Sequence, residues 1–274
     1  MTLEEKGEWM EENLLLVERR ERICTIIFNR PERRNAFSPV QLYQLAENLT
    51  QLKREDEVRC LVLRGAGDKA FSSGYDITAL PTDVKPEVME ALRTKNPLQI
   101  SLQAIRDFPY PVIAMINGMA FGAGCELAVT CDIRIAADTA RLGMPPAKLG
   151  LVYMPAGLMR FINVVGMAGA KEIFFTGRYF PASRAKEMGL VHYVLPFDQL
   201  IPFTDEMARE ISQNAPLSLK GIKTIFNACL KYQEIHPEDM KEIEKLVAQA
   251  FNSEDLKEGQ KAFREKRKPV FQGR

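Results

Sequence analysis

The stretch INGMAFGAGCELAVTCDIRIAA at residues 116–137 gives the clearest indication of the fold. Its middle part, FGAGCEL at 121–127, is a turn of small residues that runs directly into a helical pattern carrying a carboxylate, Glu126. Glycine lets the backbone approach a ligand closely, and the first turn of a helix offers unpaired N–H groups and a dipole that favours negative charge. The stretch therefore predicts a glycine turn that can hold an anion, then a helix, then a strand.

A second segment has the same character. FSSGYDI at 71–77 follows a strand-like run and places small residues and a glycine before an acid. Two such turns could each direct one N–H at a single oxygen, and donors of this kind usually contribute most to the stabilisation of an enolate or an acyl oxyanion. A lone glycine turn is more often a packing device. The pairing of two turns, with Glu126 entering an apolar helix face, favours a functional site.

Composition and charge exclude several classes of protein. The chain has 274 residues, of which 46% are hydrophobic and 27% charged, so it can bury the core of one large domain. The net charge of +1 gives no general surface for nucleic acid. No apolar run approaches the roughly 20 residues that span a bilayer, and the start MTLEEKGEWMEEN is unlike a targeting peptide. We expect a cytoplasmic enzyme without a membrane or nucleic-acid partner.

Cysteine and histidine usage points away from metal or disulfide chemistry. The cysteines are odd in number, contain no CxxC spacing and mostly occupy apolar runs, so we expect reduced packing residues. The two histidines cannot assemble a His-rich metal site. His192 lies in a strand-like run, where a structural role is the more common one. The sequence thus predicts no metal and no separate cofactor.

Strand-like runs alternate with segments of helical period, and this rhythm predicts an α/β chain with parallel strands. The strand-like runs lie at 24–30, 59–65, 112–118, 132–137 and 191–196. The helical segments lie at 38–54, 98–108, 123–131 and 183–188. From about residue 198 onward only helical patterns follow. We therefore expect an α/β core over 1–197 and a helical region over 198–274.

The apolar residues of this helical region allow two interpretations, internal core or subunit interface, and the pattern does not decide between them. They are Ile222, Ile225, Phe226, Ile243, Leu246 and Val247.

Taken in order, five motifs resemble the enoyl-CoA hydratase/isomerase, or crotonase, superfamily over about residues 14–274. They are NRPERRNAF at 29–37, FSSGYDI at 71–77, the glycine-turn stretch at 116–137, TGRYFPASRAKEMGLVHYVLP at 176–196 and the terminal AFREKRKPVFQGR. The resemblance implies a crotonase-like spiral of ββα units with a C-terminal helical trimerisation region. It also implies a homotrimer or a dimer of trimers, and coenzyme A bound as part of a thioester substrate.

The resemblance also assigns roles to individual residues. It implies a thioester enolate held by two backbone N–H groups, which fall here on Ser73 and Ala123. It implies that the backbone of the segment beginning at Ser73 holds the adenine end, and basic side chains are suited to the phosphates. The expected coenzyme A-binding residues are Arg33, Arg34, Ser72, Gly74, Tyr75, Asp76, Ile77, Gly122 and Lys268.

The chain departs from the hydratase pattern at one position. Hydratases of the superfamily hold a water between two glutamates, and Glu126 matches the first of them. The segment LGMPPAKLG places Pro146 where the second would stand. Addition of water across a double bond needs one group to activate the water and another to deliver a proton, and proline can do neither.

The segment KLGLVYMPAGL at 148–158 carries Tyr153 instead, which is similar to the methylmalonyl-CoA decarboxylase branch of the superfamily. Expulsion of carbon dioxide forms the enolate without a strong base, so it tolerates Pro146. We hypothesise a lyase that decarboxylates a short malonyl-type CoA thioester, with Tyr153 positioning the carboxylate and Glu126 donating the proton. Tyr75 departs from this branch, because the resemblance leads us to expect a histidine there.

Two other functions remain open from the sequence. A hydratase or isomerase would use Glu126 as its one clear acid or base. A non-catalytic acyl-CoA-binding protein on the same fold is a third possibility, because one catalytic acid is missing.

Overall fold

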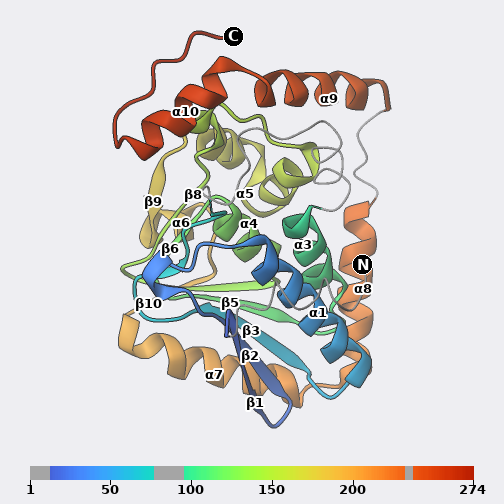
Figure 1. Ribbon diagram of the computed structural model, residues 1–274. Coiled ribbons are helices and arrows are strands. Elements are labelled where there is room, and N and C mark those ends of the chain that lie inside the picture. The colour runs from blue at the N-terminus through green and yellow to red at the C-terminus, as the bar shows by residue number, and fades with distance from the viewer. Residues whose placement is uncertain (1–12, 77–95, 232–236) are drawn as a thin grey trace, which may run out of the picture.

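The computed structural model of the chain describes residues 13–76, 96–231 and 237–274. These residues form two sheets surrounded by helices (Figure 1). The fold is the mixed α/β architecture with parallel strands that the sequence predicts.

The larger sheet has six strands in the order β1-β2-β3-β5-β7-β10. Its strands are β1 (Leu15–Arg20), β2 (Ile23–Phe28), β3 (Cys60–Gly65), β5 (Val112–Ile116), β7 (Ile133–Ala137) and β10 (Tyr193–Leu195). The strands β2 to β10 pair in parallel, and β1 joins the edge as the antiparallel partner of β2. All five predicted strands are found in this sheet, which confirms the predicted parallel arrangement.

The smaller sheet has the order β4-β6-β8-β9 and positions the candidate site. Its strands are β4 (Ala70–Ser72), β6 (Met119–Phe121), β8 (Arg141–Gly143) and β9 (Tyr179–Pro181). Strands β4 and β6 are parallel neighbours. Because parallel strands end at the same edge of a sheet, the segments that follow β4 and β6 emerge side by side.

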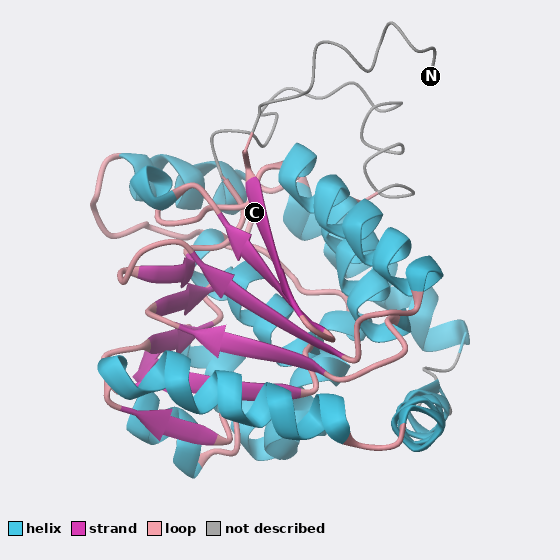
Figure 2. Cartoon of the chain, turned by 90° about the horizontal axis from the view of Figure 1, so that it is seen from below, coloured by secondary structure: helices cyan, strands magenta, loops and turns pink. Residues whose placement is uncertain are grey.

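Helices cover both faces of the larger sheet, with α7 on one side and α1, α3 and α4 on the other (Figures 1 and 2). The α-helices are α1 (Pro39–Glu55), α3 (Pro97–Asp107), α4 (Ala123–Thr130), α5 (Pro155–Thr176), α6 (Ala182–Glu187), α7 (Phe197–Gln213), α8 (Pro216–Lys231), α9 (Pro237–Phe251) and α10 (Glu254–Arg264). Two short 3₁₀ turns, η1 (Pro31–Arg33) and η3 (Pro146–Leu149), precede α1 and α5. Helix α1 begins where expected, because the Ser38 side chain accepts a hydrogen bond from the Gln41 N–H.

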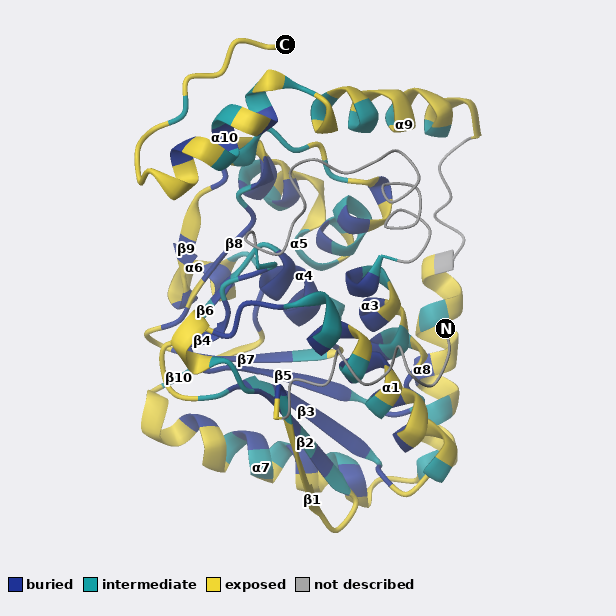
Figure 3. Ribbon diagram, in the orientation of Figure 1, coloured by how far each residue is buried: buried dark blue, intermediate teal, exposed yellow. Residues whose placement is uncertain are grey.

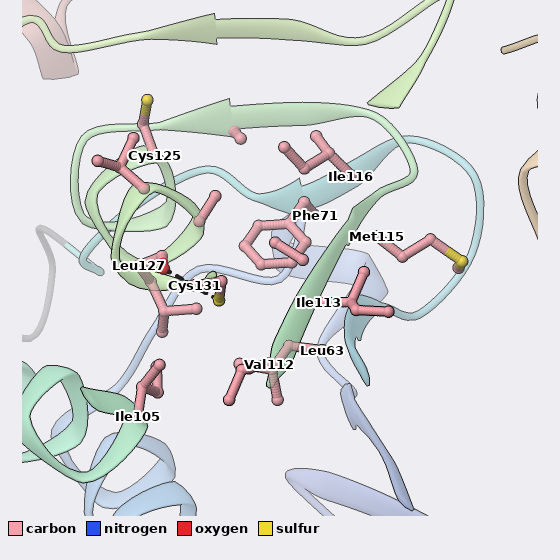
Figure 4. Packing of buried hydrophobic residues seen from close by; sticks show 14 of the residues in the cluster. Leu63, Phe71, Ile105, Val112, Ile113, Met115, Ile116, Cys125, Leu127 and Cys131 are labelled. Carbon is pink, nitrogen blue, oxygen red and sulfur yellow. Dashed lines mark hydrogen bonds between the residues drawn. The ribbon is translucent and has the colours of Figure 1, made fainter. Parts of the chain in front are cut away.

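The core lies between the larger sheet and these helices, and β3, β5 and α4 are buried in Figure 3. Figure 4 shows side chains of β3 and β5 packing with Phe71, Ile105 and residues of α4. Every side chain of β5 is buried. A strand buried on both faces reads as a continuous apolar run, which explains why the sequence identified it.

Helix α7 belongs to the core layer. Its residues Leu200, Thr204 and Ala208 are fully buried at one-turn intervals, and the helix packs on β3, β5 and β7. The helical region expected from residue 198 therefore begins with a helix that packs on the larger sheet, as part of the α/β core.

Helix α8 is fastened to the core by a lysine. The Lys223 ammonium donates to the Asp132 carboxylate at 2.7 Å and to the Tyr110 carbonyl at 2.9 Å. On the other sides of α8, Ile225 and Phe226 are 63% and 66% exposed. Ile225 and Phe226 are thus not part of the internal core of a single chain.

The cysteine and histidine expectations agree with this packing. Cys24, Cys60, Cys125 and Cys131 are buried thiols. His192 accepts a hydrogen bond at Nδ1 from the Arg134 N–H at 3.1 Å, as a structural histidine does. In the described part of the chain no group of His, Cys, Asp and Glu could hold a metal ion, and no helix there is suited to cross a membrane.

We predict that Lys223→Met lowers the free energy of unfolding by about 2 kcal/mol, because it removes the cation that pairs with the Asp132 carboxylate and the donor to the Tyr110 carbonyl. Urea unfolding monitored by circular dichroism measures the change. Lys220→Met is the matched control, since Lys220 forms an exposed pair with Asp56 whose loss costs less than about 1 kcal/mol. Equal effects of the two substitutions would contradict the anchoring role of Lys223.

Candidate active site

Two glycines bring the predicted turns into contact. A Cβ on Gly74 would lie 2.8 Å from the Phe121 carbonyl oxygen and 3.5 Å from the Ala123 nitrogen. A Cβ on Gly124 would lie 2.5 Å from the Ser72 carbonyl oxygen. Gly74 also has a φ of +105°, which disfavours any other residue. The turn after β4 and the turn after β6 therefore touch backbone to backbone.

The Ala123 amide is available for a ligand. Ala123 is the first residue of α4, and the preceding Gly122 has φ 50° and ψ −122°, a conformation restricted to glycine. The Gly122 N–H donates to the Gly143 carbonyl, whereas the Ala123 N–H has no acceptor among the described residues. A free N–H at a helix N-terminus, where the dipole is positive, suits a developing negative charge.

The Ser73 amide is not available, and the prediction that it holds the enolate oxygen is wrong. Its N–H donates to the Arg34 carbonyl at 3.0 Å. The next amide, of Gly74, donates to the Ser72 hydroxyl at 3.1 Å. Ser73 is thereby joined to the loop after η1, in which Arg34 and Asn35 both adopt left-handed backbone conformations.

Tyr75 provides the free amide of this turn. Tyr75 forms a parallel bridge with Phe37, whose N–H donates to the Gly74 carbonyl and whose carbonyl accepts from Asp76. In a parallel ladder the residue opposite Phe37 directs its own N–H away from that strand. Within the described ranges the Tyr75 N–H has no acceptor. The two free amides of the touching turns thus belong to Tyr75 and Ala123.

Glu126 and Tyr153, which are 27 positions apart, are in direct contact. The Tyr153 hydroxyl donates to Glu126 Oε2 at 2.6 Å. The Glu126 side chain is 1% exposed and projects from the first turn of α4. Gly157 leaves the space for this pair, because a Cβ there would lie 2.6 Å from the Tyr153 ring. The structure therefore brings together the two side chains that the sequence selected.

Arg160 completes this cluster, and the sequence analysis missed it. Its Nη1 donates to Glu126 Oε1 at 2.5 Å, and its Nη2 donates to the Gln99 side-chain oxygen at 3.0 Å. Both Glu126 oxygens therefore accept hydrogen bonds, which is the pattern of an ionised carboxylate. Burial and then the Glu126 charge raise the pKa of Tyr153 well above its ordinary value, so the phenol keeps its proton.

Four of the residues expected to bind coenzyme A form two pairs with different surroundings. Arg33 and Arg34 are exposed and lie beside the first turn, because their carbonyls accept from the Ser73 hydroxyl and amide. Ser72 and Asp76 are engaged in the fold: Ser72 is fully buried, and Asp76 forms an ion pair with Arg30 at 3.2 Å.

Two further predicted residues lie away from the described contacts. Ile77 is outside the described residues. Lys268 is exposed in the C-terminal segment, where the neighbouring Arg267 pairs with Glu258 of α10. No contact in the described part of the structure joins Lys268 to either glycine turn.

Two other positions considered near the site, Pro146 and Cys125, supply no second acid. Pro146 is buried at the start of η3, so the position expected for a second glutamate carries no titratable group. Cys125, next to Glu126, is fully buried, and this burial raises the pKa of its thiol to about 12. A thiol with such a pKa is not a nucleophile at neutral pH.

Comparison with known proteins agrees with this geometry. The model of the enoyl-CoA hydratase/isomerase family matches residues 18–274. The chain belongs to that family. It is 34% identical over 253 residues to the methylmalonyl-CoA decarboxylase of Escherichia coli, covering 92% of this chain and 95% of that protein. It is thus an enzyme of the enoyl-CoA hydratase/isomerase superfamily.

Two solved structures of the family are compared with the chain. A methylmalonyl-CoA decarboxylase in complex with 2-nitronate-propionyl-CoA superposes with a TM-score of 0.88 at 33% identity, covering 95% of this chain and 98% of that one. An enoyl-CoA hydratase from Bacillus anthracis gives 0.74 at 32% identity, covering 95% and 99%. The matches therefore include both reaction types.

We predict that Gly74→Ala lowers turnover by at least about 100-fold, the order of effect of losing one oxyanion donor, because the added methyl group would press on the Phe121 carbonyl and separate the two turns. Steady-state kinetics with the thioester that proves to be the substrate measures the loss. Gly221→Ala is the control, since a Cβ there meets no atom within 4 Å. An active Gly74→Ala enzyme would show that the site does not need this contact.

Proposed function

We propose that the chain is an acyl-CoA lyase that decarboxylates a short malonyl-type CoA thioester through a thioester enolate. One observation carries the proposal: two free amides, of Tyr75 and Ala123, meet on touching turns beside the Tyr153–Glu126–Arg160 cluster at the start of α4. Coenzyme A enters as part of the substrate, so the proposed reaction uses no separate cofactor.

The proposed reaction needs an oxyanion site more than it needs a base. The bond between the α-carbon and the carboxylate breaks, carbon dioxide leaves, and the electron pair moves into the thioester carbonyl to form the enolate. Two fixed N–H donors stabilise the charge that develops on the enolate oxygen. Since no proton is removed from carbon, a buried proline at position 146 is compatible with this chemistry.

The proton that completes the reaction comes from Tyr153 in this proposal. We expected Glu126 to donate it, but both Glu126 oxygens accept hydrogen bonds in the structure. The Tyr153 hydroxyl does carry a proton and is held in place by Glu126. To position the substrate carboxylate, the hydroxyl turns its one proton from Glu126 Oε2 to that carboxylate. After carbon dioxide has left, it adds this proton to the α-carbon of the enolate and regains one from solvent.

The comparisons include both reaction types at similar identity, and one structural difference among them supports the decarboxylase proposal. At nearly equal sequence identity, the decarboxylase structure superposes on the chain more closely than the hydratase structure does. For the coenzyme A moiety, we assign Arg33 and Arg34 to its phosphates, because they are exposed beside the Ser73 turn. Lys268 stays in the proposal as a third basic group.

We also propose that the chain forms a homotrimer or a dimer of trimers. The exposed apolar side chains of α8 support an assembly that covers them, with Ile225 and Phe226 the most exposed of the residues singled out from the sequence.

Incubation of the purified protein with methylmalonyl-CoA should release carbon dioxide and yield propionyl-CoA, as detected by mass spectrometry. Crotonyl-CoA and a dienoyl-CoA, run in parallel, should remain largely unchanged. Tyr153→Phe should lower carbon dioxide release by about 10² to 10⁴-fold, because it removes the positioned proton donor. Absence of carbon dioxide together with rapid hydration of crotonyl-CoA would reject the proposal.

A hydratase or isomerase is the second candidate, and the burial of Glu126 at the first hydratase glutamate favours it. Under that function Glu126→Gln abolishes turnover, whereas a decarboxylase loses less. For a non-catalytic binding protein, calorimetry would show acetyl-CoA binding without turnover of any thioester in the panel.

A further inference from the structure

Arg160 is held at the candidate site by three helices. It projects from α5, donates to Glu126 of α4 and donates to Gln99 of α3. Its side chain is 10% exposed, and the Glu126 side chain that it pairs with is 1% exposed. The pair is therefore removed from water, where attraction between charges is strong and an unpaired charge is costly.

The surroundings of Arg160 are unfavourable for a purely structural arginine. Its Nε is buried and has no hydrogen-bond partner in the described structure. The guanidinium of Arg106, on α3, lies close enough that burial and then the positive charge of Arg160 lower the pKa of Arg106. A buried donor without an acceptor and a nearby like charge both oppose folding. Such costs are typical of residues retained for function.

The Glu126 carboxylate contacts one cation and one neutral donor. The groups that face the carboxylate are the Tyr153 hydroxyl, a neutral donor, and the Arg160 guanidinium, a cation. Among the described residues Arg160 alone forms an ion pair with Glu126. A buried carboxylate without a nearby cation has a higher pKa than one that is paired with a cation. Once it is protonated, one of its oxygens carries an O–H and becomes a hydrogen-bond donor.

We propose that Arg160 is a positioning residue that keeps Glu126 ionised and directs its Oε2 at the Tyr153 hydroxyl. This inference rests on the proposed function, in which Tyr153 returns the proton to the enolate. Because Arg160 keeps Glu126 in the acceptor form, Glu126 cannot deliver a proton to an enoyl thioester.

The experiment compares Arg160→Met and Arg160→Lys with the wild type. Arg160→Met removes the charge at similar volume, and we expect kcat for carbon dioxide release to fall about 100-fold with a small change in KM. We expect the acidic limb of its pH–rate profile to move upward by about 1 pH unit or more. Arg160→Lys retains a cation and should restore most of kcat and return the limb toward its original position.

A matched control separates this effect from the loss of any arginine. Arg184→Met removes an exposed arginine that pairs with Glu172 and Glu187, and it should leave kcat and the pH profile unchanged. If Arg160→Met has the pH profile of the wild type, or if Arg160→Lys is as impaired as Arg160→Met with no return of the limb, the positioning role is refuted.

A second measurement needs no substrate and therefore separates the failure of this inference from the failure of the proposed function. In thermal unfolding at pH 8, Arg160→Met should lower the melting temperature strongly in the wild-type background and weakly in a Glu126→Gln background, because the neutral amide needs no cation. Equal shifts in the two backgrounds would show that Arg160 acts independently of Glu126, whatever thioester the enzyme consumes.

Discussion

The contact between two glycine turns is the constraint on which the candidate site depends. Gly74 lies against the Phe121 carbonyl and close to the Ala123 amide, while Gly124 lies against Ser72. Neither position has room for a methyl group, so the distance between the turns is fixed by backbone contact rather than by adjustable side chains. The parallel pairing of β4 and β6 places the turns at the same edge of the smaller sheet. Helix α4 starts at this point, and Glu126 therefore lies one turn from the free Ala123 amide.

The sequence predicted the features that depend on local pattern. The buried parallel strands are continuous apolar runs, and α1 is preceded by a Ser-Pro cap, so both could be recognised without a structure. The strands of the smaller sheet are only three residues long and escaped notice. Helix α5 was also missed, because its glycines, including Gly166 with a φ of 70°, interrupt the helical pattern.

Two features of the site required three-dimensional information. Whether the Ser73 N–H is free depends on its hydrogen-bond acceptor. That acceptor is the carbonyl of Arg34, which lies in a loop 39 positions earlier in the chain. Only the bridge between Phe37 and Tyr75 shows which amide of the turn remains free. Arg160 follows Glu126 by 34 positions and lies in the helix that the pattern failed to predict. The spacing of Gly157 and Arg160 was the available signal, because residues three apart in a helix share one face.

For the proposed decarboxylation, the charges at the site offer a role for Glu126 other than that of an acid. A substrate carboxylate bound beside the ionised Glu126 would experience repulsion, and this repulsion is relieved when the negative charge moves to the thioester oxygen and carbon dioxide leaves. Because Arg160 binds Glu126 on the oxygen that does not face Tyr153, the contact between Glu126 Oε2 and the Tyr153 hydroxyl is left intact. The amides of Tyr75 and Ala123 then stabilise the charge at its new position. In this arrangement the same fixed charges disfavour the reactant and favour the enolate, so that differential stabilisation, rather than proton abstraction, drives the proposed reaction.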